Sequence, residues 1–261
     1  FPFALLILLM TFYYRIDTVM IERLLPEGAA QAGIYYQGFR WFEALNMLGY
    51  LVAGLLLPMF SRMLKEHADV SSLTALAFKL MLASSLGVAA FGTWHAEEVM
   101  ALLYREHTSE AAPVFALLMW SFVAVCTTYV FGTLLTAAGS LRWLNWMAAG
   151  GAALNIALNL VLIPRMQAEG AAWAALTSQV LTAVVQLLLA VRAQRLVGMA
   201  LIALRALTHG AVLIGMAWLI DGAGLALHWA AALFAPAAMA SAWATGLLRP
   251  KELRAALAER G

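Results

Sequence analysis

Charged side chains inside long apolar stretches are the residues of this sequence that could do chemistry. Arg15 and Asp17 lie in the first apolar stretch of the chain, and a second pair, Arg40 and Glu43, lies in the next. Arginine stays charged and offers a planar fork of donors to phosphate or carboxylate oxygens. A carboxylate in the same surroundings can form an ion pair or couple transport to an ion gradient. These residue types together point to transport of an anionic substrate.

Helical spacing predicts which of these side chains share a face. Tyr36, Arg40 and Glu43 follow one another at intervals of four and three residues, so they form one stripe. Arg40 and Glu43 can therefore pair within their own helix. Arg15 and Asp17 are two residues apart, about 200° around a helix, and do not face each other. Asp17 therefore needs a partner from another segment, either of this chain or of the part of the protein upstream of it.

The cost of burying charge sets the roles that we expect. Each charge at a helix centre costs about 2.5–3.5 kcal/mol. Four unpaired charges would then cost roughly 10–14 kcal/mol, comparable to the whole stability of a domain at about 5–15 kcal/mol. We expect Arg40, Arg15 and Tyr36 to line a water-filled cavity that binds the substrate, with Asp17 and Glu43 as ion-pair or coupling groups. The alternative is a set of buried salt bridges that fix helix register.

Other polar residues in apolar stretches are neutral. Asn155 and Asn159 share a face with small alanines, and Gln179 begins a similar stripe. We interpret all three as polar contacts that pack helices together. We expect no enzyme activity, metal or cofactor, because no phosphate-binding glycine loop or Gly-x-Ser-x-Gly motif is present. The single cysteine, Cys126, excludes an intrachain disulfide and is expected to be a packing residue.

The composition requires that these residues lie in membrane-spanning helices. Of the 261 residues, 64% are hydrophobic and 11% are charged, and the mean hydropathy is +0.85. Soluble domains have about 45–50% apolar and about 25% charged residues. A soluble enzyme, a disordered chain and a nucleic-acid binder are excluded, and the net charge of +2 is too small for a polyanion-binding surface. Long continuous apolar stretches, without alternation, predict a helical membrane protein.

A membrane helix needs about 20 mostly apolar residues, and this rule predicts eight spans. They cover residues 3–25, 33–57, 74–94, 113–138, 141–163, 171–191, 204–220 and 225–248. Short connections between them carry helix-breaking residues such as Pro58 and Pro164, and the longest connection is 95–112. The chain opens with Phe1 inside an apolar stretch, and we expect it to be a piece of a longer protein.

Basic residues in alternate connections predict the orientation in the membrane. One set of connections holds eleven: Arg62, Lys65, Lys79, Arg142, Arg192, Arg195, Arg205, Arg249, Lys251, Arg254 and Arg260. The other set holds three: Arg23, Arg105 and Arg165. The first set is therefore expected to be cytoplasmic, which places both ends of this chain on the cytoplasmic side.

Two stretches of the sequence resemble a known transporter family. The stretch 14–62 resembles the start of the second half of the oligosaccharide and polysaccharide flippases, members of the multidrug/oligosaccharidyl-lipid/polysaccharide exporter superfamily. The matching pattern consists of Arg15 and Asp17, Gly33 and Tyr35, Arg40 and Glu43, Leu57 and Pro58, and Ser61 and Arg62. The stretch 155–175 carries Asn-x-x-x-Asn, Ile-Pro and Glu-Gly-Ala-Ala elements similar to the eleventh and twelfth helices of that family.

The resemblance implies an architecture and an activity. Residues 1–191 would form the second six-helix lobe, residues 192–248 two additional helices, and residues 249–261 a basic cytoplasmic tail. The first lobe would be the missing upstream part. The protein would flip undecaprenyl-diphosphate-linked oligosaccharide across the bacterial cytoplasmic membrane, by alternating access and coupled to H⁺ or Na⁺, for surface polysaccharide biosynthesis. Arg40 would be the leading diphosphate ligand.

Four other functions are alternatives to this one. A cation-coupled multidrug exporter or a lipid II flippase of the same superfamily would share the fold. A non-transporting membrane scaffold for polysaccharide assembly would not explain charges that face a cavity. A membrane glycosyltransferase lacks a substantial catalytic loop. The expected partners are the lipid-linked oligosaccharide, membrane lipids and the missing lobe, with no nucleic acid.

Overall fold

The computed structural model of this chain describes residues 15–249, and this part contains α-helices and no sheet. Residues 15–24 are helical. The helices that follow are α2 (Gly28–Lys65), α3 (Ser71–Trp94), α4 (Ala96–Ala101), α5 (Thr108–Ala137), α6 (Leu141–Gln194), α7 (Met199–Gly222) and α8 (Leu227–Ala244). The predicted all-α class is confirmed for the described residues.

Five of these helices, α2, α3, α5, α6 and α7, are long and apolar enough to cross a membrane. The chain is therefore a multi-pass membrane protein. The predicted span 225–248 corresponds to α8, which has 18 residues and is not one of those five helices. Most of the predicted span 3–25 lies outside the described residues.

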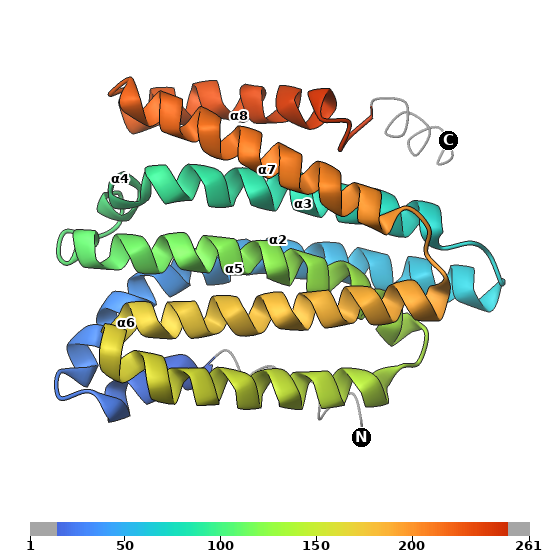
Figure 1. Cartoon of the computed structure of the whole chain (residues 1–261), viewed down its shortest axis with the longest axis horizontal. Helices are drawn as coiled ribbons and strands as arrows, with labels where there is room; N and C mark the ends of the chain where they lie inside the picture. The colour runs from blue at the N-terminus through green and yellow to red at the C-terminus, as the bar shows by residue number, and fades with distance from the viewer. Residues whose placement is uncertain (1–14, 250–261) are drawn as a thin grey trace.

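α6 is a hairpin of two antiparallel legs, which lie side by side in Figure 1. The reversal is at Gln167, whose backbone is non-helical with φ 53° and ψ −132°. Gly170 packs directly on the backbone of Leu162 across the turn, where a side chain would collide with the Leu162 carbonyl group. The two legs correspond to the predicted spans 141–163 and 171–191.

The predicted helix ends at prolines were wrong. Pro58 lies inside α2, which continues to Lys65, and Pro164 lies inside α6 before its turn. The predicted connection 95–112 contains α4 and the first residues of α5. Proline is tolerated inside membrane helices because neighbouring groups satisfy the carbonyl group that it leaves free. The rule that a helix ends before a proline therefore placed these helix ends before their true positions in the sequence.

α5 lies at the centre of the bundle. It contacts α2, α3, α4 and α6, while α7 and α8 pack on the other side of α3. Aromatic and small residues fill the core, as where the Phe78 and Phe131 rings meet edge to face with centroids 4.8 Å apart. Cys126 is buried in α5, at a position suited to the packing role expected for it.

Successive connections lie at opposite ends of the bundle (Figure 1). The connections 66–70, 138–140 and 195–198 share one end, and 25–27, 102–107 and 223–226 share the other with the α6 turn. Within residues 15–249, the two sets of connections that were separated by their basic residues are thus separated in space as well. Lys79 departs from this grouping, because it is buried inside α3. Which end faces the cytoplasm stays a prediction.

Candidate functional site

Asp17 is the centre of a buried polar cluster between three helical segments. Its side chain is 4% exposed. Tyr35 of α2 donates its hydroxyl hydrogen to Oδ2 of Asp17 at 2.8 Å. Asn159 of α6 donates from Nδ2 to Oδ1 of Asp17 at 2.7 Å. Asp17 thus takes its hydrogen-bond partners from other segments, and both of these partners belong to this chain.

The two asparagines of α6 extend the cluster. Asn159 Nδ2 also lies 3.1 Å from Oδ1 of Asn155, one helical turn away, and both residues are fully buried. The spacing of four residues correctly predicts that the two amides share a face. Their contact with a carboxylate was not predicted, because it joins residues 142 positions apart in the sequence. Tyr35, which was predicted only as part of a family pattern, also belongs to the cluster.

The Asp17 cluster has the chemistry of a site for a proton or a small cation. No Lys, Arg or His nitrogen within residues 15–249 lies within 4.0 Å of the Asp17 carboxylate. A buried carboxylate without a counter-ion is costly in a membrane span. Oδ1 of Asn159 is also buried without a hydrogen-bond partner in this part of the chain. Carboxylate and amide oxygens are the ligands that hard cations prefer.

The predicted stripe on α2 lies largely at the surface of the described part of the chain. Arg40 and Tyr36 are exposed, and the Arg40 Cζ atom lies 5.9 Å from the centroid of the Tyr36 ring. This places the guanidinium group over the ring face, a cation–π contact. Helical side chains lean toward the N-terminus, which explains why Arg40 meets the residue one turn before it.

Glu43 pairs with Arg15 and not with Arg40. Glu43 Oε1 lies 3.7 Å from Arg15 Nη2, and the two side chains are 46% and 63% exposed. The Arg40–Glu43 pair that the spacing allows within α2 is therefore not formed. The reason is that Arg40 turns toward Tyr36, while the helix over 15–24 brings Arg15 alongside Glu43. Within residues 15–249, Arg40 has no ion pair.

The exposed position of these charges restricts what can cover them. Exposed Arg15, Arg40 and Glu43 would be costly against lipid, so this face of α2 requires water or another protein surface. Apolar residues follow on the same helix, including exposed Met47 and Leu51. The charged face is thus a short polar segment on an otherwise apolar membrane helix.

Gln179 is buried in the second leg of α6, on the stripe that continues with Thr182 and Gln186. This stripe packs against glycines. A Cβ atom at Gly151 of the first leg would lie 2.9 Å from Thr182 Oγ1, and one at Gly132 of α5 would lie 2.9 Å from Gln186 Oε1. The surroundings of the stripe are those of a tight helix interface.

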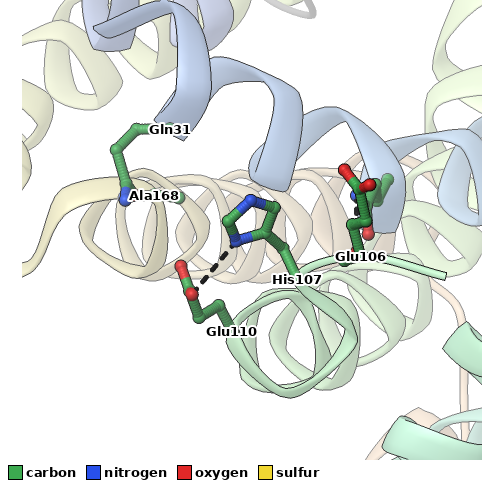
Figure 2. A network of polar contacts seen from close by, with 6 residues as sticks. Gln31, Glu106, His107, Glu110 and Ala168 are labelled. Carbon is green, nitrogen blue, oxygen red and sulfur yellow. Dashed lines mark hydrogen bonds and ion pairs between the residues drawn. The ribbon is translucent and has the colours of Figure 1, made fainter. Parts of the chain in front are cut away.

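A second polar network, at one end of the bundle, was not predicted (Figure 2). Gln31 Oε1 accepts the backbone hydrogen of Ala168 at 3.2 Å, which ties α2 to the α6 turn. Gln37 Nε2 donates to the carbonyl oxygen of Glu106 at 3.3 Å. His107, in the left-handed region at φ 56°, lies with Nδ1 3.1 Å from Glu110 Oε1. Two of these contacts hold the N-terminal part of α2, which leads into the charged stripe, against the α6 turn and the 102–107 connection.

An apolar cavity of about 830 Å³ lies between α3 and α8, bordered also by α2, α4 and α5. Its lining contains Phe91, Phe115 and Phe234 and no acidic residue. Sequence periodicity gave no signal for it, because every helix around it is apolar on most faces. Among residues 15–249, no group of three or more His, Cys, Asp or Glu side chains could hold a metal ion.

Comparison with models of known protein families and with curated proteins found no match. The resemblance of the stretches 14–62 and 155–175 to flippases therefore stays an expectation. A function is therefore proposed from the contacts and exposure of Arg40 and Asp17.

Proposed function

We propose that this chain forms part of a transporter that flips undecaprenyl-diphosphate-linked oligosaccharide across the bacterial cytoplasmic membrane for surface polysaccharide biosynthesis. The observation that carries the proposal is Arg40, an exposed guanidinium group on the candidate membrane span α2 with no carboxylate partner in the described part of the chain. A cation held in this way is suited to an anionic substrate that enters from a water-filled cavity.

The surroundings of Arg40 fit a diphosphate. Its contact with Tyr36 holds the guanidinium group over the ring and leaves N–H donors free for oxygen atoms. Arg15 provides a second guanidinium group beside the same stripe, through its contact with Glu43. Two arginines can together match the several oxygens of a diphosphate, which a single lysine cannot do with the same geometry.

The charged face of α2 supports a two-lobe architecture. We infer that residues 1–191 form the second lobe, that residues 192–248 add two helices, and that a six-helix lobe upstream supplies the opposite wall. The cavity between the lobes would open alternately to the two sides of the membrane. Membrane lipids would cover the apolar outer faces of the helices.

Asp17 supports coupling to an ion gradient. It is a buried carboxylate with neutral hydrogen-bond donors around it, so uptake of H⁺ or Na⁺ would neutralise it in place. The site lies on the same helical segment as Arg15, which brings coupling and substrate chemistry within one helical turn.

The test measures flipping and membrane abundance together for variants of the full-length transporter. Arg40→Ala should weaken substrate binding by roughly 10- to 150-fold, because a charge-assisted contact contributes about 1.5–3 kcal/mol. Arg40→Lys should lose activity in part, since it keeps the charge but not the fork. Arg62→Ala, at the end of α2, is the control. Normal flipping by Arg40→Ala at normal abundance would contradict the proposal.

A cation-coupled exporter of apolar compounds is the second candidate. The observation in its favour is the apolar cavity between α3 and α8. Neither Asp17 nor any other carboxylate is among the residues that line this cavity. A cation-coupled exporter needs an acidic group there, so the first proposal is preferred. A lipid II flippase would use the same diphosphate chemistry and is distinguished by the sugar that is transported. A non-transporting scaffold would leave flipping unchanged in every Arg40 variant.

A further inference from the structure

We propose that Glu43 is an internal occupant of the anion site: it holds Arg15 when no substrate is bound, and the diphosphate displaces it. This inference rests on the proposed function. It goes further, because it assigns to Glu43 a regulatory contact that a simple binding site does not need.

The Arg15–Glu43 contact has the geometry of a weak, exchangeable pair. Its N–O distance is 3.7 Å and both side chains are about half exposed. Charge-assisted hydrogen bonds of full strength are shorter, at about 2.7–2.9 Å. An exposed pair of this kind adds little stability, so a ligand with several anionic oxygens can replace the single carboxylate.

The position of Glu43 makes its release useful. It stands three residues after Arg40 on the same face of α2, and Arg15 reaches it from the neighbouring helix. While Glu43 is paired with Arg15, its negative charge partly neutralises the combined positive charge of the two guanidinium groups. After release, both positive charges face the ligand, and the exposed Glu43 carboxylate turns to water.

Displacement also changes how the helix over 15–24 is held. Two polar contacts between described residues tie this segment to α2: Arg15 with Glu43 and Asp17 with Tyr35. Substrate binding would remove the first and leave the second in place. The segment could then shift about its anchored Asp17, which links anion binding to helix movement.

The first experiment measures the affinity of inorganic pyrophosphate for the purified full-length protein in detergent at low salt. Glu43→Gln should bind pyrophosphate up to about fivefold more tightly than the unaltered protein, because the competing pair is removed. Glu43→Asp, with a shorter side chain, should shift affinity in the same direction by less. Arg15→Gln should weaken binding.

Glu66→Gln is the matched control. It breaks another exposed pair on the same helix, Arg62–Glu66, which is 3.0 Å long with side chains 80% and 56% exposed. It should leave the affinity for pyrophosphate unchanged. Equal or weaker binding by both Glu43 variants would overturn the exchange while leaving the proposed function standing. No binding to any variant would overturn both.

A second experiment follows the helix movement. Spin labels at the exposed positions of Val19 and Met47, with buried Cys126 replaced by alanine, report the distance between the 15–24 segment and α2. Saturating pyrophosphate and the Glu43→Gln substitution should change the distance distribution in the same direction. An unchanged distribution in both cases would overturn the link to helix movement.

Discussion

Arg15 and Asp17, two residues apart on one helix, contact their partners on opposite faces of it. Arg15 lies 3.7 Å from Glu43 on the exposed face of α2, whereas Asp17 is buried against Tyr35 and Asn159. A separation of about 200° around the helix axis makes this division unavoidable. One helical turn therefore carries both an exposed cation and a buried carboxylate.

Tyr35→Phe should destabilise the protein, whereas Tyr36→Phe should not. The first substitution removes the hydroxyl donor of a buried carboxylate, and a hydrogen bond to a charged group is worth about 1.5–3 kcal/mol. The second keeps the ring below Arg40 and removes an exposed hydroxyl group. Thermal unfolding in detergent measures the difference. Equal midpoints for the two variants would show that the Tyr35–Asp17 contact adds no stability.

Asp17→Asn should remove the dependence of transport on the ion gradient. An amide cannot be neutralised by a proton or attract a cation as a carboxylate does, and its NH₂ group would face the donors of Tyr35 or Asn159. Flipping measured with and without an imposed H⁺ or Na⁺ gradient tests this. The control is Asp69→Asn, which alters an exposed carboxylate that accepts the backbone hydrogen of Ser71 at 2.9 Å. Transport by Asp17→Asn that still follows the gradient would exclude Asp17 as the coupling group.

Gly151→Ala should destabilise the α6 hairpin, while its neighbour Gly150→Ala should not. A Cβ atom at Gly151 would lie 2.9 Å from Thr182 Oγ1, whereas one at Gly150 meets no atom within 4 Å. Thr182 is short and its hydroxyl group donates to the Ser178 carbonyl oxygen, so it cannot easily move away. Overpacking costs about 1–3 kcal/mol, and alanine at Gly150 should gain about 0.5–1 kcal/mol in helix propensity. Unfolding midpoints that fall for both variants would contradict this account of the interface.

The two ends of the bundle should lie on opposite sides of the membrane, with the basic end in the cytoplasm. Ala68→Cys and Ala223→Cys introduce thiols at exposed positions of opposite ends. In intact cells, a membrane-impermeant thiol reagent should label the Ala223 variant and spare the Ala68 variant until the cells are lysed. Buried Cys126 should stay unlabelled in both. The reverse labelling would invert the predicted orientation.

Apolar length and helical spacing were enough to predict much of the bundle. Long apolar stretches identified the helices α2, α3, α5 and α7 and both legs of α6, because a bilayer demands about 20 apolar residues from each span. Spacing of three and four residues placed Tyr36, Arg40 and Glu43 on one face. Helix ends were predicted less well, since Pro58 and Pro164 interrupt neither α2 nor the first leg of α6.

The tertiary structure decided which side chains contact one another. Asp17 contacts Asn159, which lies 142 positions away in the sequence. Glu43 pairs with Arg15 of the neighbouring helix and not with Arg40 of α2, the helix to which Glu43 belongs. Local periodicity fixes the direction in which a side chain leaves its helix, but not which helix lies opposite. That choice depends on how several helices pack at once, and packing joins segments that no local pattern connects.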